Sequence, residues 1–255
     1  MSVLRARCPG CKSLTAVALE DGYECHVCGR EYAAGLVRVP RAFGSGGEEM
    51  AAAAALDLPY PEAAVVERET VEAQAEALAS ALPARPLVLG GCCCAHLGVI
   101  RGLAARHGRL AVVWMDAHGD LNTPETSPSG NAWGMPLRMA IDEGSVDPAD
   151  VALWGARDLD PPEAAFAAEQ GIDDDLARAV AGTAAVYVAL DADVLAPGEV
   201  ACFMPEPGGP SVDELESALR QVVTFGVPVA GLGLTGLTPR ADVATLTRLA
   251  AALGL

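Results

Sequence analysis

Two apolar runs, each followed by closely spaced carboxylates, place the strongest constraint on how this chain can fold. Residues 110–115 and 184–190 have the length and composition of buried parallel strands. The polar residues that follow the two runs at alternate positions are Asp116, His118 and Asp120, and then Asp191 and Asp193. Because ligands in open α/β sheets lie where the strands end, the pattern predicts one cleft holding four carboxylates and an imidazole.

So much negative charge cannot lie together unneutralised. Either cations bind there, or the pKa values of the carboxyl groups rise sharply. Oxygen ligands with one imidazole favour a hard divalent ion such as Mn²⁺ over zinc, and more than four ligand groups indicate two ions. The alternative interpretation of each motif alone is a strand-ending turn with solvated acids.

The composition sets limits on the class of protein. Hydrophobic residues make up 51% of the 255 residues and charged residues 20%, so a large core is available. The net charge of −17 argues against nucleic acid or an anionic membrane as a partner, and is compatible with a cationic substrate. The N-terminus shows no secretory signal, and no apolar stretch reaches the roughly 20 residues needed to span a bilayer. We therefore expect a cytoplasmic protein with no membrane segment.

Two C-x-x-C pairs near the N-terminus predict a small metal site of their own. They comprise Cys8 and Cys11, then Cys25 and Cys28. This spacing is typical of a structural zinc ribbon with four cysteine ligands, although spacing alone also permits iron. Residues 1–41 hold six Arg or Lys and four acids, which favours a docking or stabilising role over nucleic-acid binding. The Gly-rich break at residues 42–47 predicts a ribbon domain over 1–41 and an α/β domain over 42–255.

The remaining pattern predicts a doubly wound parallel sheet. The spacing of apolar residues predicts a helix over residues 63–82. A second helix is expected over Ser211–Phe225, beginning with a capping box formed by Ser211 and Glu214. Residues 227–234 read as the last strand. The fold class expected from these elements is α/β, with the cleft at the strand ends.

Four segments resemble the arginase family, the manganese-dependent ureohydrolases. They are L-V-L-G-G-C-C-C-A-H-L-G-V (87–99), D-A-H-G-D-L-N-T-P-E-T-S-P-S-G-N (116–131), W-G-A-R-D-L-D-P-P-E (154–163) and V-A-L-D-A-D-V-L-A-P (188–197). They occur in the family's order, and the resemblance covers roughly residues 86–255. It implies an arginase-like fold, a homo-oligomer and metal-activated hydrolysis of a guanidino or other linear amidine compound.

The resemblance also implies roles for single residues. Two Mn²⁺ ions would be bridged by Asp116 and Asp191. Cys93 and Asp120 would complete the first site, and His118 and Asp193 the second. Asp120 and His118 would take part in catalysis, with Asp120 orienting the attacking hydroxide. The residues implied to bind substrate are Asn122, Ser129, Asn131 and Asp160.

Three departures from the family pattern concern the chemistry. Cys93 stands where the family has a metal-binding His, so it is either a substituted ligand or the mark of a lost metal. Trp133 stands where arginases often have a proton-shuttling His. No acid occurs over 231–239, although arginases usually place a guanidinium-binding Glu near Gly236. We expect a variant hydrolase of a modified guanidine or other amidine. The alternatives are a catalytically weak or inactive arginase-fold binding protein, and an enzyme that uses Cys93 as a nucleophile.

Overall fold

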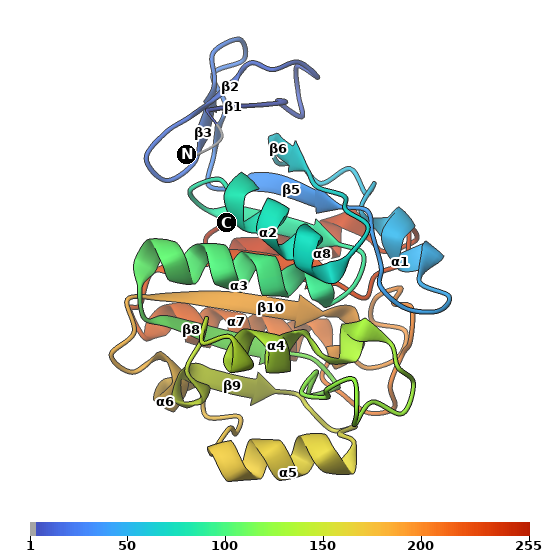
Figure 1. The fold of residues 1–255 in the computed structure, drawn as a ribbon. Helices are drawn as coiled ribbons and strands as arrows, with labels where there is room; N and C mark the ends of the chain where they lie inside the picture. The colour runs from blue at the N-terminus through green and yellow to red at the C-terminus, as the bar shows by residue number, and fades with distance from the viewer. Residues whose placement is uncertain (1–3) are drawn as a thin grey trace.

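The computed structural model describes residues 4–255, which form two sheets of different size (Figure 1). The small sheet is antiparallel and lies at one end of the molecule. Its strands, paired in chain order, are β1 (Arg5–Ala6), β2 (Ala16–Ala18), β3 (Tyr23–Cys25) and β4 (Glu31–Tyr32). Cys25 is the last residue of β3. Cys8 and Cys11 lie between β1 and β2, and Cys28 lies between β3 and β4.

The large sheet has seven parallel strands in the order β6-β5-β7-β11-β10-β8-β9. The strands are β5 (Gly35–Val39), β6 (Glu62–Val65), β7 (Pro86–Gly90), β8 (Leu110–Met115), β9 (Val151–Trp154), β10 (Ala185–Asp191) and β11 (Val229–Thr235). At the centre, Val188 of β10 pairs with Val113 on one side and Leu232 on the other. Because parallel strands need crossovers, helices cover both faces of this sheet.

The helices are α1 (Glu48–Ala53), α2 (Val71–Ala81), α3 (Cys94–His107), α4 (Pro136–Asp142), α5 (Pro161–Gln170), α6 (Leu176–Val180), α7 (Val212–Thr224) and α8 (Val243–Ala252). Three 3₁₀ turns lie at Ala132–Gly134, Pro148–Asp150 and Ala192–Val194.

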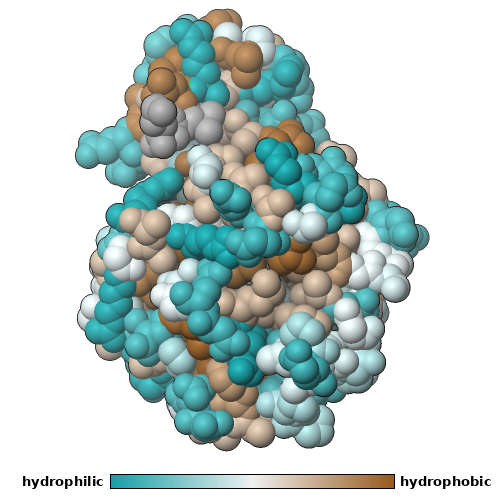
Figure 2. Space-filling view, viewed as in Figure 1, coloured by the Kyte–Doolittle hydropathy of each residue, from teal (hydrophilic) through white to brown (hydrophobic). Residues whose placement is uncertain are grey.

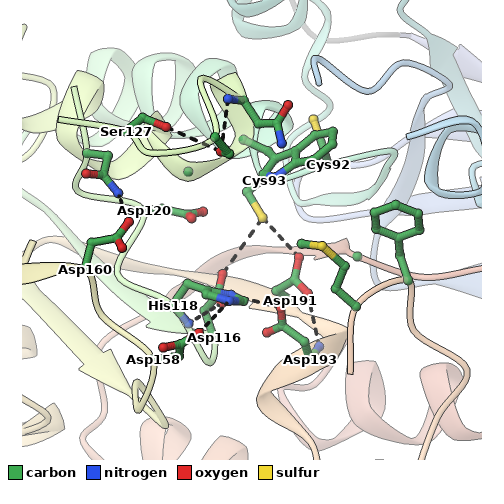
Figure 3. A pocket seen from close by; sticks show the side chains of 18 of the residues that line it. Cys92, Cys93, Asp116, His118, Asp120, Ser127, Asp158, Asp160, Asp191 and Asp193 are labelled. Carbon is green, nitrogen blue, oxygen red and sulfur yellow. Dashed lines mark hydrogen bonds and ion pairs between the residues drawn. The ribbon is translucent and has the colours of Figure 1, made fainter. Parts of the chain in front are cut away.

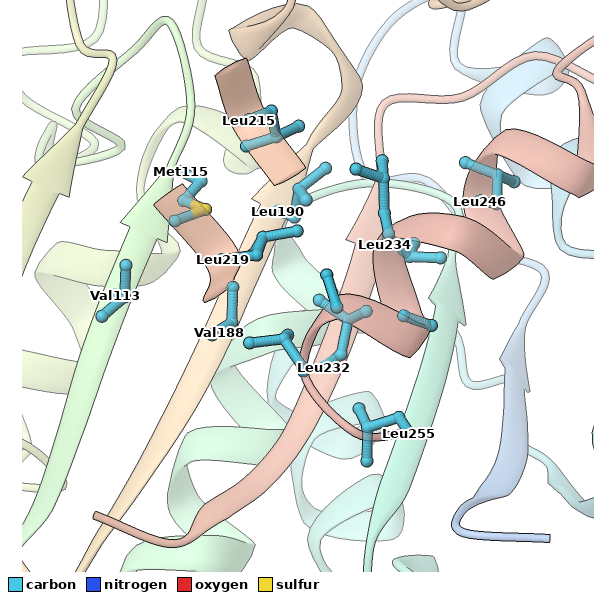
Figure 4. Close-up of a cluster of buried hydrophobic side chains, with 14 of the residues drawn as sticks. Val113, Met115, Val188, Leu190, Leu215, Leu219, Leu232, Leu234, Leu246 and Leu255 are labelled. Carbon is cyan, nitrogen blue, oxygen red and sulfur yellow. The ribbon is translucent and has the colours of Figure 1, made fainter. Parts of the chain in front are cut away.

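Two hydrophobic cores lie on the two faces of the large sheet. One contains Val113 and Met115 of β8 together with side chains of α6, α7 and α8 (Figure 4). The other contains Val112 and Trp114 of the same strand with side chains of α2, α3 and α4. Successive residues of a strand point to opposite faces, so β8 contributes to both cores and is buried along its whole length. The expectation of a doubly wound, arginase-like parallel sheet is confirmed.

The expectation of one helix over residues 63–82 is wrong in its first part. Residues 62–65 form β6, and the helix begins only at Val71, where the hydroxyl of Thr70 accepts a hydrogen bond from the Ala73 amide. A short apolar run cannot be assigned to helix or strand by its spacing alone, and edge pairing with β5 decides it here.

Strand β5 also bears on the division into domains. It lies on the N-terminal side of the expected boundary at residue 42, yet it pairs with β7 and β6 in the large sheet. The division into domains remains a prediction, and we now propose its boundary between β4 and β5. The two parts also meet through an antiparallel bridge between Arg7 and Glu62.

The exposed apolar side chains are unevenly distributed over the described residues. Several large ones lie in the N-terminal segment, where Figure 2 shows hydrophobic surface at the top of the molecule. They are Leu4, Leu14, Leu19 and Val27. Among residues 4–255, no helix is both long and apolar enough to cross a bilayer.

Candidate metal centre

A cavity of about 230 Å³ opens at the carboxyl ends of β7, β8, β10 and β11 (Figure 3). Both carboxylate motifs of the sequence contribute to its wall. So do the turn after β7 and the polar loop after β8. The predicted residues that line it are Cys93, Asp116, His118, Asp120, Asn122, Ser129, Asn131, Asp160, Asp191 and Asp193. The structure therefore brings together every residue that the sequence assigned to this site.

Asp116, His118 and Asp193 form one group of potential ligands. Their ligand atoms all lie within 4.8 Å of one another. The His118 Nδ1 atom is 3.3 Å from Asp116 Oδ1 and 3.1 Å from Asp193 Oδ2. The Ala117 amide donates to Asp193 Oδ1 at 3.1 Å and the His118 amide to Asp116 Oδ1 at 2.7 Å, so the backbone of the turn after β8 fixes both carboxylates.

Cys93, Asp116 and Asp191 form a second group that shares Asp116 with the first. The Cys93 Sγ atom is 3.0 Å from Asp191 Oδ2 and 3.9 Å from Asp116 Oδ2. Asp116 is thus placed between the two groups, as a bridging ligand would be. Asp191 belongs only to the second group, and its Oδ1 atom accepts a hydrogen bond from the Asp193 amide. A bridging role for Asp191 remains a prediction.

Asp120 lies outside both groups but lines the same cavity. Its backbone adopts a φ of 51°, in the left-handed region that non-glycine residues rarely occupy. Its Oδ2 atom is buried and has no hydrogen-bond partner among the described residues. A buried, unpaired carboxylate oxygen is costly unless a cation binds to it. The donor set therefore fits divalent ions.

The electrostatics of the cavity lead to the same conclusion. Burial, and then the charge of neighbouring carboxylates, raises the pKa of Asp191 to about 6 and that of Asp193 to about 7. Burial alone would lower the pKa of His118, but its contacts with Asp116 and Asp193 outweigh burial and raise it to about 12. Without metal ions the cluster thus retains protons, and bound cations would displace them.

The four expected substrate-binding residues line the same cavity. Asn122 Nδ2 donates to Asp160 Oδ2 at 2.9 Å, so these two side chains form one polar unit. Ser129 Oγ accepts from the Asn131 amide, and Asn131 Oδ1 accepts from the Ser45 amide. Ser129 and Asn131 therefore also hold the loop. Their role towards a substrate remains a prediction.

The structure gives physical reasons for two departures from the family pattern. A Cβ atom on Gly236 would lie 2.0 Å from Asp191 Oδ1, so no side chain fits there in this arrangement. Trp133 packs edge-on against Phe203, with ring centroids 6.2 Å apart, and both line the cavity with Met50 and Met204. One wall is thus apolar where arginases often place a proton-shuttling His.

His96, to which sequence reasoning assigned no role, takes part in a buried hydrogen-bond chain behind the cavity. The Tyr187 hydroxyl lies 2.7 Å from His96 Nδ1, and His96 Nε2 lies 3.1 Å from Thr235 Oγ1. Thr235 donates in turn to Asp191 Oδ2 at 2.9 Å. Burial lowers the pKa of His96 to about 3, so its ring is neutral. The sequence signal that could have pointed to His96 is its position three residues after Cys93.

Two further residues that the sequence reasoning left open hold the loops around the cavity. Glu163 accepts from the Leu121 and Asp160 amides, which ties the start of α5 to the turn after β8. Arg157 donates to backbone carbonyls of the loops after β9 and β10. Its partners are Gly155, Asp193, Val194, Glu206 and Pro207.

The four N-terminal cysteines converge as their spacing predicts. The Cys8 and Cys28 Sγ atoms are 3.9 Å apart, and those of Cys11 and Cys25 are 3.7 Å apart. A tetrahedron with Zn–S bonds of about 2.3 Å has S···S edges of roughly 3.8 Å, so the cluster is compatible with a zinc ribbon. A hydrogen bond to Thr15 lowers the pKa of Cys25 to about 5, which favours the thiolate that a metal needs.

The fold and this cavity together define an α/β protein with a carboxylate-rich site at the ends of its parallel strands. The sequence model of the arginase family matches residues 43–254, so the chain belongs to the arginase family.

Arginases are also among its relatives in sequence. It is 32% identical to arginase from Bacillus subtilis over 171 residues, which is 56% of this chain and 58% of that protein. It is 44% identical to arginase from Bacillus caldovelox over 99 residues, or 34% of this chain and 33% of that protein. The matched stretches thus span about a third to somewhat over half of these arginases.

Solved structures match over a longer span. The crystal structure of Bacillus subtilis arginase gives a TM-score of 0.72 at 25% identity, covering 86% of this chain and 97% of that one. Proclavaminate amidino hydrolase from Streptomyces clavuligerus gives 0.67 at 24% identity, covering 87% and 89%, and shares the fold.

Proposed function

We propose that this protein is a metal-dependent hydrolase of a linear amidine or guanidino compound. The observation that carries the proposal is the convergence of Cys93, His118 and four aspartates in one cavity, where the buried Oδ2 of Asp120 has no partner within residues 4–255. Family membership supports the same chemistry. Two divalent ions, of which Mn²⁺ is the expected one, would supply a water-derived nucleophile at neutral pH when bound.

The residues of the chain would hold and orient the components of the reaction. Asp116, His118 and Asp193 would form one ion site, and Cys93, Asp116, Asp191 and Asp120 the other. The hydrogen bonds that run from Tyr187 through His96 and Thr235 fix the orientation of Asp191. Asp120, whose Oδ2 atom has no partner in the described part of the chain, would accept a proton or hydrogen bond from the attacking water.

The cavity wall indicates what the substrate carries. With a glycine at 236, the residue after β11 offers no carboxylate to grip a guanidinium group, and Trp133, Phe203 and Met204 give the cavity an apolar part. The hydrogen-bonded pair Asn122 and Asp160 gives it a polar part. We therefore propose an amidine or modified guanidine that carries both an apolar substituent and a polar or cationic group.

The test is a screen of guanidino and amidine compounds with the full chain loaded with Mn²⁺. Release of urea, ammonia or amine is measured before and after chelation. Asp120→Asn should abolish turnover, because the amide cannot accept the proton. Asp147→Asn is the matched control, since Asp147 only caps a 3₁₀ turn through the Ala149 amide and Asn caps equally well. If no compound is turned over and Asp120→Asn changes nothing, the chain is a binding protein that retains the fold.

The structure does not favour Cys93 as a nucleophile. Burial, followed by the charges of Asp120, Asp191 and Asp116, raises the pKa of Cys93 well above its ordinary value. A protonated thiol is a poor nucleophile, and these neighbours oppose the thiolate unless a metal binds. Activity that survives chelation and is lost in Cys93→Ser would contradict this argument.

We also propose that the cluster of Cys8, Cys11, Cys25 and Cys28 binds one zinc ion with a structural role. A closed set of four cysteines leaves no position for a substrate.

A further inference from the structure

We infer that Cys93 makes one half of the metal centre selective for a thiophilic ion such as Zn²⁺, so that the centre holds two different metals. The half formed by Asp116, His118 and Asp193 would take the harder ion, Mn²⁺. The inference rests on the proposed function only in requiring that the cavity binds divalent ions. It does not require that any amidine is turned over.

The position of the sulfur atom is the first support. Cys93 Sγ lies within 4.8 Å of ligand atoms of both Asp116 and Asp191, and Cys93 is 7% exposed. Figure 3 shows the sulfur directed between these two carboxylates. Cys93 also packs in the core cluster that contains side chains of α2 and α3, but its sulfur faces the carboxylates of Asp116 and Asp191, where it is well placed as a metal ligand.

The three consecutive cysteines have different environments, which separates Cys93 from its neighbours. The Cys92 Sγ atom accepts a hydrogen bond from the Phe43 amide at 3.5 Å. Cys92 and Cys94 belong to a small apolar cluster with Met50. Of the three, Cys93 is the one that the described residues group with potential metal ligands. Cys92 and Cys93 both line the cavity, and within residues 4–255 the thiol of Cys93 is the one that lies among potential metal ligands.

The unpaired oxygen of Asp120 is an independent observation that a ligand binds in this half of the centre. Asp120 is 4% exposed, and its Oδ2 atom has no partner among the residues that the structure describes. Cys93, Asp116, Asp191 and Asp120 together offer one sulfur and carboxylate oxygens. The ligand atoms of Cys93, Asp116 and Asp191 lie within 4.8 Å of one another, and three protein ligands suit a zinc site that keeps one position open.

The two halves differ in chemical softness. Thiolates select zinc and similar ions, whereas sites of carboxylates and imidazole also suit manganese. Asp116 is common to both groups, so the two ions would share one carboxylate. A His in place of Cys93 would remove this difference between the halves. The substitution thus changes which metal enters without requiring loss of the centre.

The experiment uses Co²⁺ as a spectroscopic probe, because a thiolate bound to Co²⁺ gives a sulfur-to-metal charge-transfer absorption. The full chain, stripped of metal under reducing conditions, is titrated with Co²⁺ as wild type, Cys93→Ser and Cys92→Ser. The four N-terminal cysteines contribute equally to all three spectra, so the difference spectra report the cavity alone. Cys93→Asp, which keeps an anionic ligand, is a second variant in case Cys93→Ser does not fold.

The expected result is a charge-transfer contribution that is lost in Cys93→Ser and Cys93→Asp and retained in Cys92→Ser. Zinc affinity of the cavity should fall at least ~10-fold in the Cys93 variants, since even loss of an outer hydrogen bond to a ligand costs about 10- to 100-fold. Manganese added to the zinc-loaded wild type should then give the EPR spectrum of an isolated ion.

Identical charge-transfer spectra for wild type and Cys93→Ser would overturn the inference, and so would a coupled manganese pair when zinc and manganese are supplied together. These readouts are independent of turnover. Amidine hydrolysis with a manganese pair would refute the inference and leave the proposed function standing. A centre with one zinc and one manganese ion but no hydrolysis would support the inference and refute the proposed function.

Discussion

The metal-free protein should lose stability as the pH rises from about 4 to about 7, because of the carboxyl groups in the cavity. In the folded chain the pKa of Asp191 is about 6 and that of Asp193 about 7, with burial as the first cause. Both ionise near 3.8 when unfolded. The folded state therefore binds more protons between these values. The stabilising contribution is complete below about pH 4 and is lost as the pH rises through 6 and 7.

The size of the effect follows from the larger of the two shifts. A pKa of about 7 in place of 3.8 corresponds to roughly 4 kcal/mol for Asp193. Asp193 raises the pKa of Asp191, so the two contributions overlap, and we take ~4 kcal/mol for the pair. For a chain of this size each kcal/mol shifts the melting temperature by about 2–4 °C. The expected loss is therefore roughly 10 °C.

The assay is thermal unfolding of the chelator-treated chain across this pH range, with Asp193→Asn beside the wild type. The variant should show a flatter profile. The substitution removes one titrating carboxyl group. It also removes a partner that raises the pKa of His118 to about 12, and the raised pKa of His118 itself makes stability fall as the pH rises above ~6.5. The amide oxygen can still accept the hydrogen bond from the Ala117 amide. Asp147→Asn should follow the wild type. Stability that rises with pH in the metal-free chain would refute the reasoning.

Three further predictions concern single positions. Gly236→Ala should lower stability by about 2–4 kcal/mol in thermal unfolding, because its φ of 66° is strained for alanine and the new Cβ meets Asp191 Oδ1. A melting temperature equal to that of the wild type would show that the turn moves freely. Ser211→Ala should cost about 1 kcal/mol and Ser211→Asp much less, since Ser211 Oγ caps the Glu214 amide of α7. Arg157→Ala should expose the loop over 202–210 to limited proteolysis, because its guanidinium donates to the carbonyls of Glu206 and Pro207; unchanged cleavage rates would contradict this.

The central strands were predictable because their sequences are unambiguous. Residues 110–115 are apolar throughout, and β8 spans those residues. Both motifs that follow the strands reach the same cavity because β8 and β10 are neighbours in the sheet. The capping box of Ser211 and Glu214 forms as its spacing predicts. In these regions local pattern and tertiary packing favour the same structure.

The elements that the sequence did not reveal depend on distant partners. Strand β5 forms because β7 and β6 lie on either side of it, and β6 has only four residues. Likewise His96 could be recognised only once Tyr187 and Thr235, far away in the chain, were brought to it. A Cβ on Gly233 would lie 2.2 Å from the Tyr187 hydroxyl, so this glycine leaves the space that the chain of hydrogen bonds occupies.

The bridge between Arg7 and Glu62 has a consequence for self-association. Strand β6 is the edge of the large sheet, and exposed edge strands can pair with other chains. The Arg7 amide donates to the Glu62 carbonyl at 2.8 Å and the Glu62 amide to Arg7 at 2.9 Å, so the cysteine-bearing segment occupies this edge. Oxidation of the four clustered thiols would release that segment and free the edge. Oxidative damage to this protein should therefore appear first as intermolecular β-pairing, while the cavity at the far strand ends is still intact.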